Sequence, residues 1–483
     1  MPIPLLVEAN PRTEVLLLHA PYPGILRFEG QPSSLLHAVS VFAHRLVADG
    51  QLEVLGWCDP GMPSEAYREQ LRHLLQSSQV RVLCISTSNA AIEETIWAVQ
   101  LARTLRGDEL LVIVGGPHED DCDEKVATRV AGVDLSIGGD AEFVLDFVLH
   151  SYRSRAERPA AFLRWLRGAL PRALLRGSGV TVTSPAWGTM KLELPPQTAA
   201  DLVPPVWTTK QVRFSVFGGR HTLPVLVSRG CSYGKCTFCA EPNQAGARIV
   251  RESFAWLREL VAMHPGAAVY FQDSIFPRGA AIERELLPLL KELQVAWGAQ
   301  VSLRALSRPG LEQLRAHGCC YLSTGLESGS AEILAAIGKA NMNRAVALER
   351  LAWMRDLGFR VGISLMFGAI SLDGRLLETE ATVAETLRLA VDIRALGVEV
   401  TGFYPNILTV LAGTELERSL RAHGIRLDFY RMPRTEAFAP FEDGGVGYNF
   451  VTLGKALRQA AEPGLAKRLV EAEATLSATS SRT

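Results

Sequence analysis

Several features that would assign a chain to a broad class are missing from this sequence. No apolar run approaches the roughly 20 residues that a membrane span requires. The segment Met1-Pro2-Ile3-Pro4 has neither the charged region nor the long apolar stretch of a signal peptide. Neither sign of charge is in excess, with 50 Lys and Arg against 51 Asp and Glu. We therefore expect a cytoplasmic protein with no membrane span and no general attraction to nucleic acid.

Cysteine is scarce as well, with eight residues in a chain of 483. So few cysteines in so long a chain do not make a disulfide framework, which again fits a reducing cytoplasm. Apolar residues make up 48% of the sequence, enough for large cores. The length predicts two or three domains.

Three of the eight cysteines, Cys231, Cys236 and Cys239, lie within nine residues. The apolar run at 223–227 before them predicts a buried strand. The thiols would then lie on a loop at the carboxyl end of that strand, where sheet and barrel enzymes place their chemistry. Clustered thiolates bind soft metals, so zinc and an iron–sulfur cluster are the alternatives.

A structural zinc site is closed by four protein ligands. A fourth ligand would have to come from His221, Cys319 or Cys320. Three thiolates alone leave one metal position open, which favours chemistry over scaffolding.

Residues 222–412 alternate predicted strands with helical patterns. The predicted strands are Leu223–Val227, Ala268–Gln272, Val295–Ser302, Cys320–Thr324, Arg360–Met366 and Val398–Phe403. Six such βα units make a partial, open version of the (βα)₈ barrel.

Residues 1–150 have the same rhythm, which predicts a parallel, doubly wound Rossmann-like (flavodoxin-like) sheet. The predicted strands are Val15–His19, Leu52–Trp57, Val80–Ser86, Leu110–Gly115 and Val133–Ile137. Glycines follow several of them, where ligands bind in such sheets and a backbone can come close to them.

The cysteine loop resembles that of radical S-adenosylmethionine (SAM) enzymes, including the ending Thr237-Phe238-Cys239. The resemblance implies that the three cysteines hold a [4Fe–4S] cluster whose fourth iron is chelated by SAM. One feature departs from the family: four residues separate Cys231 from Cys236, where most members have three.

The segment Gly325-Leu326-Glu327-Ser328-Gly329-Ser330, followed by Ile337-Gly338-Lys339, also resembles this family. With the neighbouring strand ends, it implies a set of SAM-binding residues. These are Phe238, Asp273, Ser302, Arg304, Glu327, Ser328 and Gly368. Other interpretations stay open, because Asp273 could shape a turn, Arg304 could form a structural ion pair and Ser328 could cap a helix.

The first 150 residues resemble the cobalamin-binding domain that often precedes a radical SAM barrel. The cobalamin-binding residues implied are Ser86, Thr87, Gly115, Gly116, Pro117, Gly138 and Gly139. The Asp-x-His-x-x-Gly signature that supplies a cobalt ligand in many cobalamin proteins is missing. His19 and His118 are possible ligands, but a single His near a strand end more often belongs to a turn. The alternative is a Rossmann-like domain without the cofactor.

We expect four regions: the cobalamin-binding-type domain at 1–150, a linker at 151–221, the barrel at 222–412, and a helical cap with a polar tail at 413–483. The linker would contain a basic helix near 161–170 and an extended, Pro-rich crossing segment that includes 184–188. A basic amphipathic helix can bind a membrane surface, or it can pack one face on a domain.

Together the resemblances imply a cobalamin-dependent radical SAM enzyme that methylates an unactivated carbon of a small metabolite or peptide. It would need an external one-electron donor such as flavodoxin or ferredoxin. The alternatives are a radical SAM enzyme with a non-methylating outcome, such as cyclisation, rearrangement or dehydrogenation, and a non-catalytic metal-binding scaffold. The sequence assigns no catalytic residue beyond the cofactor ligands.

Overall fold

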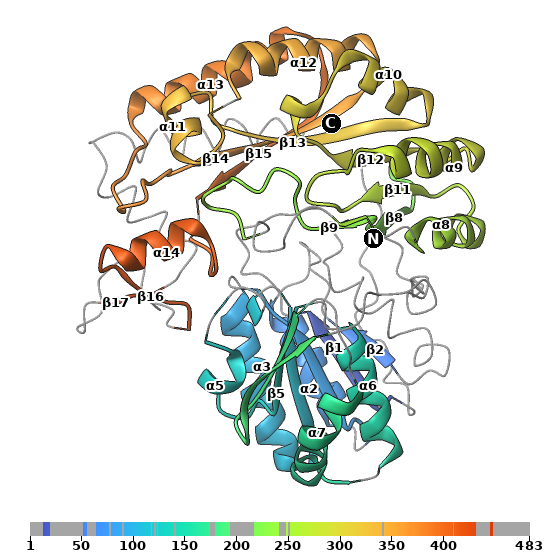
Figure 1. Ribbon diagram of the computed structural model, residues 1–483, viewed down its shortest axis with the longest axis vertical. Coiled ribbons are helices and arrows are strands. Elements are labelled where there is room, and N and C mark those ends of the chain that lie inside the picture. Colours follow the sequence, from blue (N-terminus) through green and yellow to red (C-terminus); the bar gives the residue numbers. More distant parts are fainter. Residues whose placement is uncertain are drawn as a thin grey trace. The chain divides into compact units, whose positions relative to one another are not determined.

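The structure of the protein is a computed structural model. It describes residues 13–19, 52–55, 64–76, 79–88, 91–116, 118–119, 122, 124–139, 142–155, 157–173, 179–193, 217–240, 248–249, 252–340, 342–408, 410–430 and 445–447. The chain divides into two compact units, Met1–Lys210 and Gln211–Thr483 (Figure 1).

The first unit is built on a seven-stranded sheet in the order β2-β1-β3-β4-β5-β6-β7. Its strands are β1 (Val15–His19), β2 (Leu52–Leu55), β3 (Val82–Ser86), β4 (Leu111–Gly115), β5 (Leu135–Gly138), β6 (Gly179–Ser184) and β7 (Gly188–Glu193). The first five are parallel, and each matches a predicted strand. The chain order reverses between β1 and β3, and such a switch point is where doubly wound sheets bind ligands.

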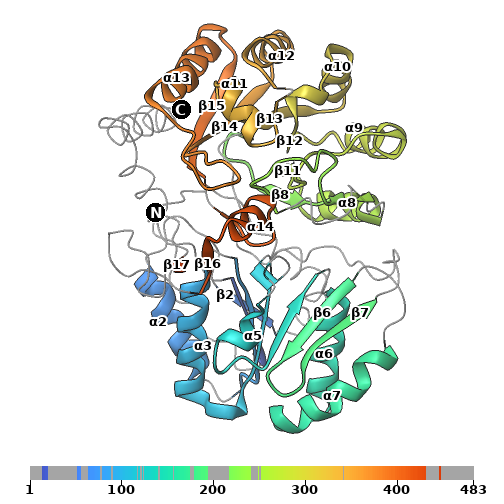
Figure 2. The same cartoon turned by 60° about the vertical axis from the view of Figure 1, so that its left-hand side comes forward.

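Helices cover both faces of this sheet (Figure 2). They are α2 (Ser64–Leu75), α3 (Ile92–Arg106), α5 (Val126–Arg129), α6 (Glu142–Ser154) and α7 (Pro159–Ala173), with a 3₁₀ turn at Gly107–Glu109. One core forms where alternate strand residues such as Val15, Val82 and Ile113 meet α6 and α7. Strands buried on both faces explain why these segments are continuous apolar runs in the sequence.

Residues 179–193 form a β-hairpin that extends this sheet. β6 pairs antiparallel with β5, and β7 pairs antiparallel with β6. The prediction of an extended linker through 184–188 is therefore wrong. This Pro- and Gly-containing stretch is the turn of the hairpin, and the alternating apolar residues Val180 and Val182 are buried in the core.

The basic helix predicted near 161–170 is present as α7. Its apolar side chains Phe162, Leu166 and Leu170 are completely buried against the sheet. This is the packing alternative, since a helix whose apolar face is already covered cannot insert that face into a membrane. Among the described helices, none combines the length and hydropathy that crossing a membrane demands.

The second unit contains a parallel six-stranded sheet in the order β15-β14-β13-β12-β11-β8. Its strands are β8 (Thr222–Val225), β11 (Ala268–Phe271), β12 (Trp297–Gln300), β13 (Cys319–Glu327), β14 (Arg360–Phe367) and β15 (Glu399–Ile407). Each matches a predicted strand. Because all six are parallel and follow chain order, their carboxyl ends share one edge.

Helices follow one another along one face of this second sheet (Figure 1). They are α8 (Glu252–Met263), α9 (Leu287–Glu292) preceded by a π-helical turn at Ile282–Leu286, α10 (Arg308–Ala316), α11 (Ala331–Ala336), α12 (Arg344–Asp356) and α13 (Glu380–Ala395). A 3₁₀ turn lies at Leu303–Ala305. Beyond the sheet come α14 (Glu415–Ala422) and a small pair, β16 (Arg426–Asp428) with β17 (Gly445–Gly447).

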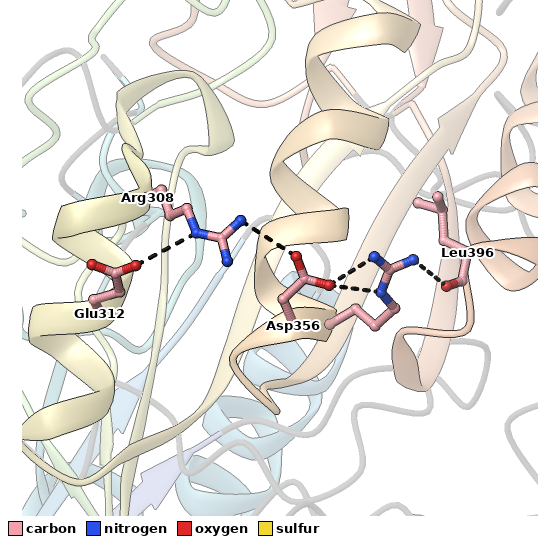
Figure 3. A network of polar contacts seen from close by, with 5 residues as sticks. Arg308, Glu312, Asp356 and Leu396 are labelled. Carbon is pink, nitrogen blue, oxygen red and sulfur yellow. Dashed lines mark hydrogen bonds and ion pairs between the residues drawn. The ribbon is translucent and has the colours of Figure 1, made fainter.

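Exposed ion pairs join neighbouring helices of this layer (Figure 3). Arg308 of α10 contacts Glu312 at 3.5 Å and Asp356 of α12 at 3.4 Å. Arg355 donates to Asp356 and to the Leu396 carbonyl after α13. Surface pairs of this kind contribute at most about 1 kcal/mol each, so buried apolar packing holds the layer together.

Candidate functional site

The cysteine loop starts at the carboxyl edge of the second sheet. It leaves the short strand β9 (Ser228–Arg229), which pairs antiparallel with β10 (Arg248–Ile249). Cys231, Cys236 and Cys239 are each a half-buried thiol. The backbone turns within the loop, since the Cys239 amide donates to the Cys236 carbonyl at 3.2 Å. The predicted position of the three thiols at a strand end is confirmed.

The loop lies against the backbone of residues 337–339. The Tyr233 hydroxyl donates to the Gly338 carbonyl at 2.6 Å, and the Thr237 amide donates to the Ile337 carbonyl at 3.2 Å. Gly338 has φ of 82°, and a Cβ on it would lie 2.0 Å from the Lys235 carbonyl oxygen. Only glycine permits this approach, so the cysteine loop and residues 337–339 form one packed unit.

An ion pair lies beside this contact. The Lys339 ammonium is 2.7 Å from Glu327 Oε1 and donates to the Gly325 carbonyl at 3.1 Å. Glu327 adopts φ of 64°, which is rare for a residue with a long side chain. Burial works to lower the pKa of Lys339, but Glu327 and the sulfurs of Cys236 and Cys239 outweigh it and raise that pKa.

The donor set suits a soft, cationic metal group. Burial raises the pKa of the Cys236 thiol to about 11, and the Lys339 charge partly offsets that rise. A bound cation would displace the thiol protons, because thiolate is the ligand form. Among the described residues, no group of three or more His, Cys, Asp or Glu side chains is arranged to hold a single metal ion. Three thiolates on one loop fit an iron–sulfur cluster, in which each cysteine binds a separate iron.

The Asp273 carboxylate accepts hydrogen bonds from the residues that lead into the cysteine loop. It accepts from the Ser228 hydroxyl at 2.5 Å and from the Val227 amide at 3.3 Å. The side chain is buried, and burial raises its pKa to about 7 against the effect of these hydrogen bonds. The structure therefore uses Asp273 to shape the chain that leads into the cysteine loop, as in the turn alternative, and does not present it to a ligand.

Other predicted SAM-binding residues reach the loop. The exposed Arg304 guanidinium lies over the Tyr233 ring, 4.9 Å from its centroid, so this arginine meets the cysteine loop by stacking. Ser302 directly precedes the 3₁₀ turn that carries Arg304. Phe238 is half-buried beside Cys239. Arg304 thus contacts the cysteine loop, Phe238 belongs to it, and Glu327 pairs with Lys339, whose neighbour Gly338 packs on it.

Ser328 and Gly368 form hydrogen bonds with other residues of the chain. The Ser328 hydroxyl lies 3.0 Å from the Thr386 hydroxyl of α13, and the Gly329 amide donates to the same hydroxyl at 3.0 Å. The Gly368 amide donates to the buried Glu378 at 3.0 Å. These contacts fix the two loops that follow β13 and β14.

In the first unit, the predicted cobalamin residues lie at the carboxyl ends of β3, β4 and β5. A Cβ on Gly116 would lie 2.7 Å from Ser86 Oγ, and one on Gly138 would lie 2.5 Å from the Glu119 carbonyl. The close approach expected at these glycines is thus made by the chain itself. Thr87 is completely buried and bonded to Thr95 at 2.7 Å.

The remaining cobalamin residues differ in exposure. Gly139 is exposed, Gly115 is half-buried with the Ile137 carbonyl close by, and Pro117 lies outside the described residues. His118 is completely buried, and burial lowers its pKa to about 4, so the imidazole is neutral and not presented to a ligand. His19 ends β1.

Sequence reasoning did not single out three contributors to the site. Gly338 and Lys339 belong to the segment Ile337-Gly338-Lys339, and Tyr233 lies between Cys231 and Cys236. A lysine directly after a glycine, close behind the Glu327 segment, was the available signal. Its partner could not be found without the fold, because Glu327 lies 12 positions earlier in the sequence.

No protein-family model matches the sequence. The chain is 21% identical over 339 residues to an uncharacterized methyltransferase of Pyrococcus horikoshii, covering 69% of each chain. Over 127 residues it is 28% identical to bacteriochlorophyllide d C-12(1)-methyltransferase of Chlorobaculum tepidum, covering 25% of this chain and 27% of that enzyme.

Solved structures share the fold at low sequence identity. One is the radical SAM methyltransferase TsrM of Kitasatospora setae, with a TM-score of 0.58 and 15% identity over 86% of this chain and 77% of TsrM. Another is the cobalamin-dependent SAM radical enzyme OxsB, with a TM-score of 0.56 and 14% identity over 95% of this chain and 70% of OxsB. The chain therefore has the α/β fold of the cobalamin-dependent radical SAM enzymes.

Proposed function

We propose that the chain is a radical SAM enzyme that uses cobalamin to methylate an unactivated carbon of a small metabolite or peptide. The observation that carries this proposal is the placement of Cys231, Cys236 and Cys239 on one loop packed at the carboxyl edge of a parallel sheet. Structures of the same fold support it, since TsrM contains cobalamin and a [4Fe–4S] cluster, and OxsB contains aqua-cobalamin and SAM.

When bound, the cluster with SAM supplies radical chemistry at an unactivated carbon, and cobalamin supplies the methyl group. The chain supplies the ligands and their positions. The three cysteines would hold the cluster, and Arg304, which stacks on Tyr233 of the loop, and Glu327, which pairs with Lys339, would bind SAM. Ser302 and Phe238 would line the same edge. Asp273, Ser328 and Gly368 would act through the loops that they shape.

In the first unit, cobalamin would bind at the carboxyl ends of β3, β4 and β5, next to the switch between β1 and β3. The exposed Gly139 and the edge residue Ser86 are the candidates for direct contact. Pro117 belongs to the same predicted set. Thr87, Gly116 and Gly138, which the chain itself packs closely, would shape the loops. We assign no residue of this chain as a cobalt ligand.

The remaining parts of the proposal concern partners. A small-molecule substrate is supported by TsrM, which was solved with tryptophan bound. An external one-electron donor such as flavodoxin or ferredoxin would reduce the cluster. A cytoplasmic location fits an oxygen-sensitive group of this kind.

Cysteine variants test the cluster directly. After anaerobic reconstitution, the wild-type protein should be brown and contain about four irons and four sulfides per chain. Cys231→Ala, Cys236→Ala and Cys239→Ala should each lose most of that iron. Cys320→Ala is the matched control, because Cys320 is also half-buried in the second unit and should leave the iron content unchanged. A colourless protein that binds zinc would contradict the proposal in favour of a scaffold.

Cobalamin binding is tested separately by equilibrium dialysis with hydroxocobalamin, read by the corrin absorption of the retained protein. We expect about one corrin per chain, unchanged in Cys236→Ala, because the first unit would hold it. A wild-type protein that assembles the cluster but retains no corrin would favour a non-methylating radical reaction.

A further inference from the structure

Lys339 is a half-buried cation with a fixed position. Its side chain is 18% exposed and is held by Glu327 at 2.7 Å and by the Gly325 carbonyl at 3.1 Å. Holding a long, flexible side chain in one place costs conformational entropy, so two directed contacts are needed to fix it. The ammonium therefore acts as a localised charge.

This charge lies beside the cysteine loop. The Gly338 backbone packs onto Lys235 and Cys236, with the Cys236 Cα 3.3 Å from where a Gly338 Cβ would be. The Tyr233 hydroxyl locks the same backbone through the Gly338 carbonyl. The sulfurs of Cys236 and Cys239 are close enough to Lys339 to raise its pKa. Two of the three thiols thus share one neighbouring cation.

We propose that Lys339 is a positioning residue that sets the electrostatic potential at the metal group held by the cysteine loop, and that Glu327 opposes it. This inference rests on the proposed function, because it assumes a [4Fe–4S] cluster on Cys231, Cys236 and Cys239. It concerns the reduction of that cluster before SAM is bound.

The sign of the effect follows from charge. One electron enters from an external low-potential donor, no bond forms or breaks, and the cluster with its thiolates becomes more negative by one charge. A nearby cation stabilises the reduced form more than the oxidised form, and a nearby carboxylate does the opposite. The ion pair thus has two ends whose removal shifts the reduction equilibrium in opposite directions.

The test is a potentiometric titration with dithionite, followed by electron paramagnetic resonance, on the reconstituted full chain without SAM. Lys339→Gln should disfavour the reduced form at least tenfold, a fall in midpoint potential of about 59 mV. Lys339→Arg keeps the charge and should restore most of the shift. Glu327→Gln should raise the potential. Lys235→Gln removes an exposed charge from the same loop and should change it far less.

Each of the following results would overturn the inference. One is an equal potential in Lys339→Gln and Lys235→Gln. Another is a shift of the same sign in Lys339→Gln and Glu327→Gln, which would indicate general damage to the loop. If Lys339→Gln takes up no iron, the test rests on the midpoint potential of Glu327→Gln. A potential equal to or below that of the wild type then rejects the proposal. If the wild type cleaves SAM but every variant has the same midpoint potential as the wild type, only this inference is rejected. A wild type that assembles no cluster would reject the proposed function with it.

Discussion

The Asp273 carboxylate accepts a hydrogen bond from the Ser228 hydroxyl at 2.5 Å, three residues before the first cysteine of the loop. The same carboxylate accepts from the Val227 amide. The contact joins the end of β11 to the end of β8, and so fixes the direction in which the cysteine loop leaves the sheet. We expect this buried carboxyl to make the stability of the protein depend on pH.

We expect stability to fall as the pH rises toward neutrality. The Asp273 pKa is about 7 in the folded protein, against 3.8 for an ordinary aspartate. Between these values the folded chain keeps a proton that the unfolded chain releases, so its contribution is full below about pH 4 and is lost as the pH passes 7. The side chain of Asp273→Asn cannot ionise. The free energy of unfolding of this variant, relative to the wild type, should therefore rise by about 2 kcal/mol from pH 5 to pH 7.

Urea unfolding of both proteins at several pH values measures this difference. Asp356→Asn is the control. The Arg355 hydrogen bond lowers the Asp356 pKa, so its titration lies below this window and the difference should stay flat. A flat difference for Asp273→Asn as well would show that the carboxyl is ionised in the folded protein at all these pH values.

Gly338→Ala should disrupt the cysteine loop. Its Cβ would lie 2.0 Å from the Lys235 carbonyl oxygen, at a φ of 82°. The left-handed conformation alone costs about 1 to 2 kcal/mol, and the overlap with backbone adds a displacement of the loop. We expect the iron content after reconstitution to fall by more than half. Gly397→Ala has a similar φ of 72° with open space around it, and should keep its iron. Equal iron in the two variants would mean that the contact at Gly338 is not needed.

Thr386→Val should loosen the segment that carries Glu327. It removes the hydroxyl that accepts from the Gly329 amide and contacts the Ser328 hydroxyl, and leaving the half-buried Gly329 amide without this acceptor costs about 2 kcal/mol. Thr104→Val removes an exposed hydroxyl that makes a similar bond along its own helix, and should cost less than about 0.5 kcal/mol. Urea midpoints of the two variants check this, and similar losses would contradict it.

Much of the fold was predictable because parallel strands that are buried on both faces have continuous apolar sequences. Every strand predicted in the two sheets has an observed counterpart, from β1 (Val15–His19) to β15 (Glu399–Ile407). The hairpin at 179–193 was missed because its Pro- and Gly-containing turn has the composition of a linker. A hairpin turn and a linker differ only in whether the residues on either side pair with the edge strand of a sheet. That pairing depends on tertiary structure.

The site was predictable only in part, for the same reason. Spacing alone located the three cysteines, because a metal group needs its ligands close together. The partners of Asp273 lie 45 and 46 residues away in sequence, and those of Ser328 and Gly329 lie at Thr386. Glycines at the ends of β4 and β5 indicate a close approach to a cofactor, yet the chain itself fills that space. No local pattern distinguishes these cases.

The most direct test of the central claim is the analysis of SAM cleavage products by the anaerobically reconstituted protein, with iron, sulfide, cobalamin and dithionite supplied. We expect 5′-deoxyadenosine from the wild type and from Cys320→Ala, and none from Cys231→Ala, Cys236→Ala or Cys239→Ala. Formation of S-adenosylhomocysteine alongside it would mark methyl transfer. Unchanged 5′-deoxyadenosine from any of the three cysteine variants, or none from a wild type that carries its cluster, would contradict the account.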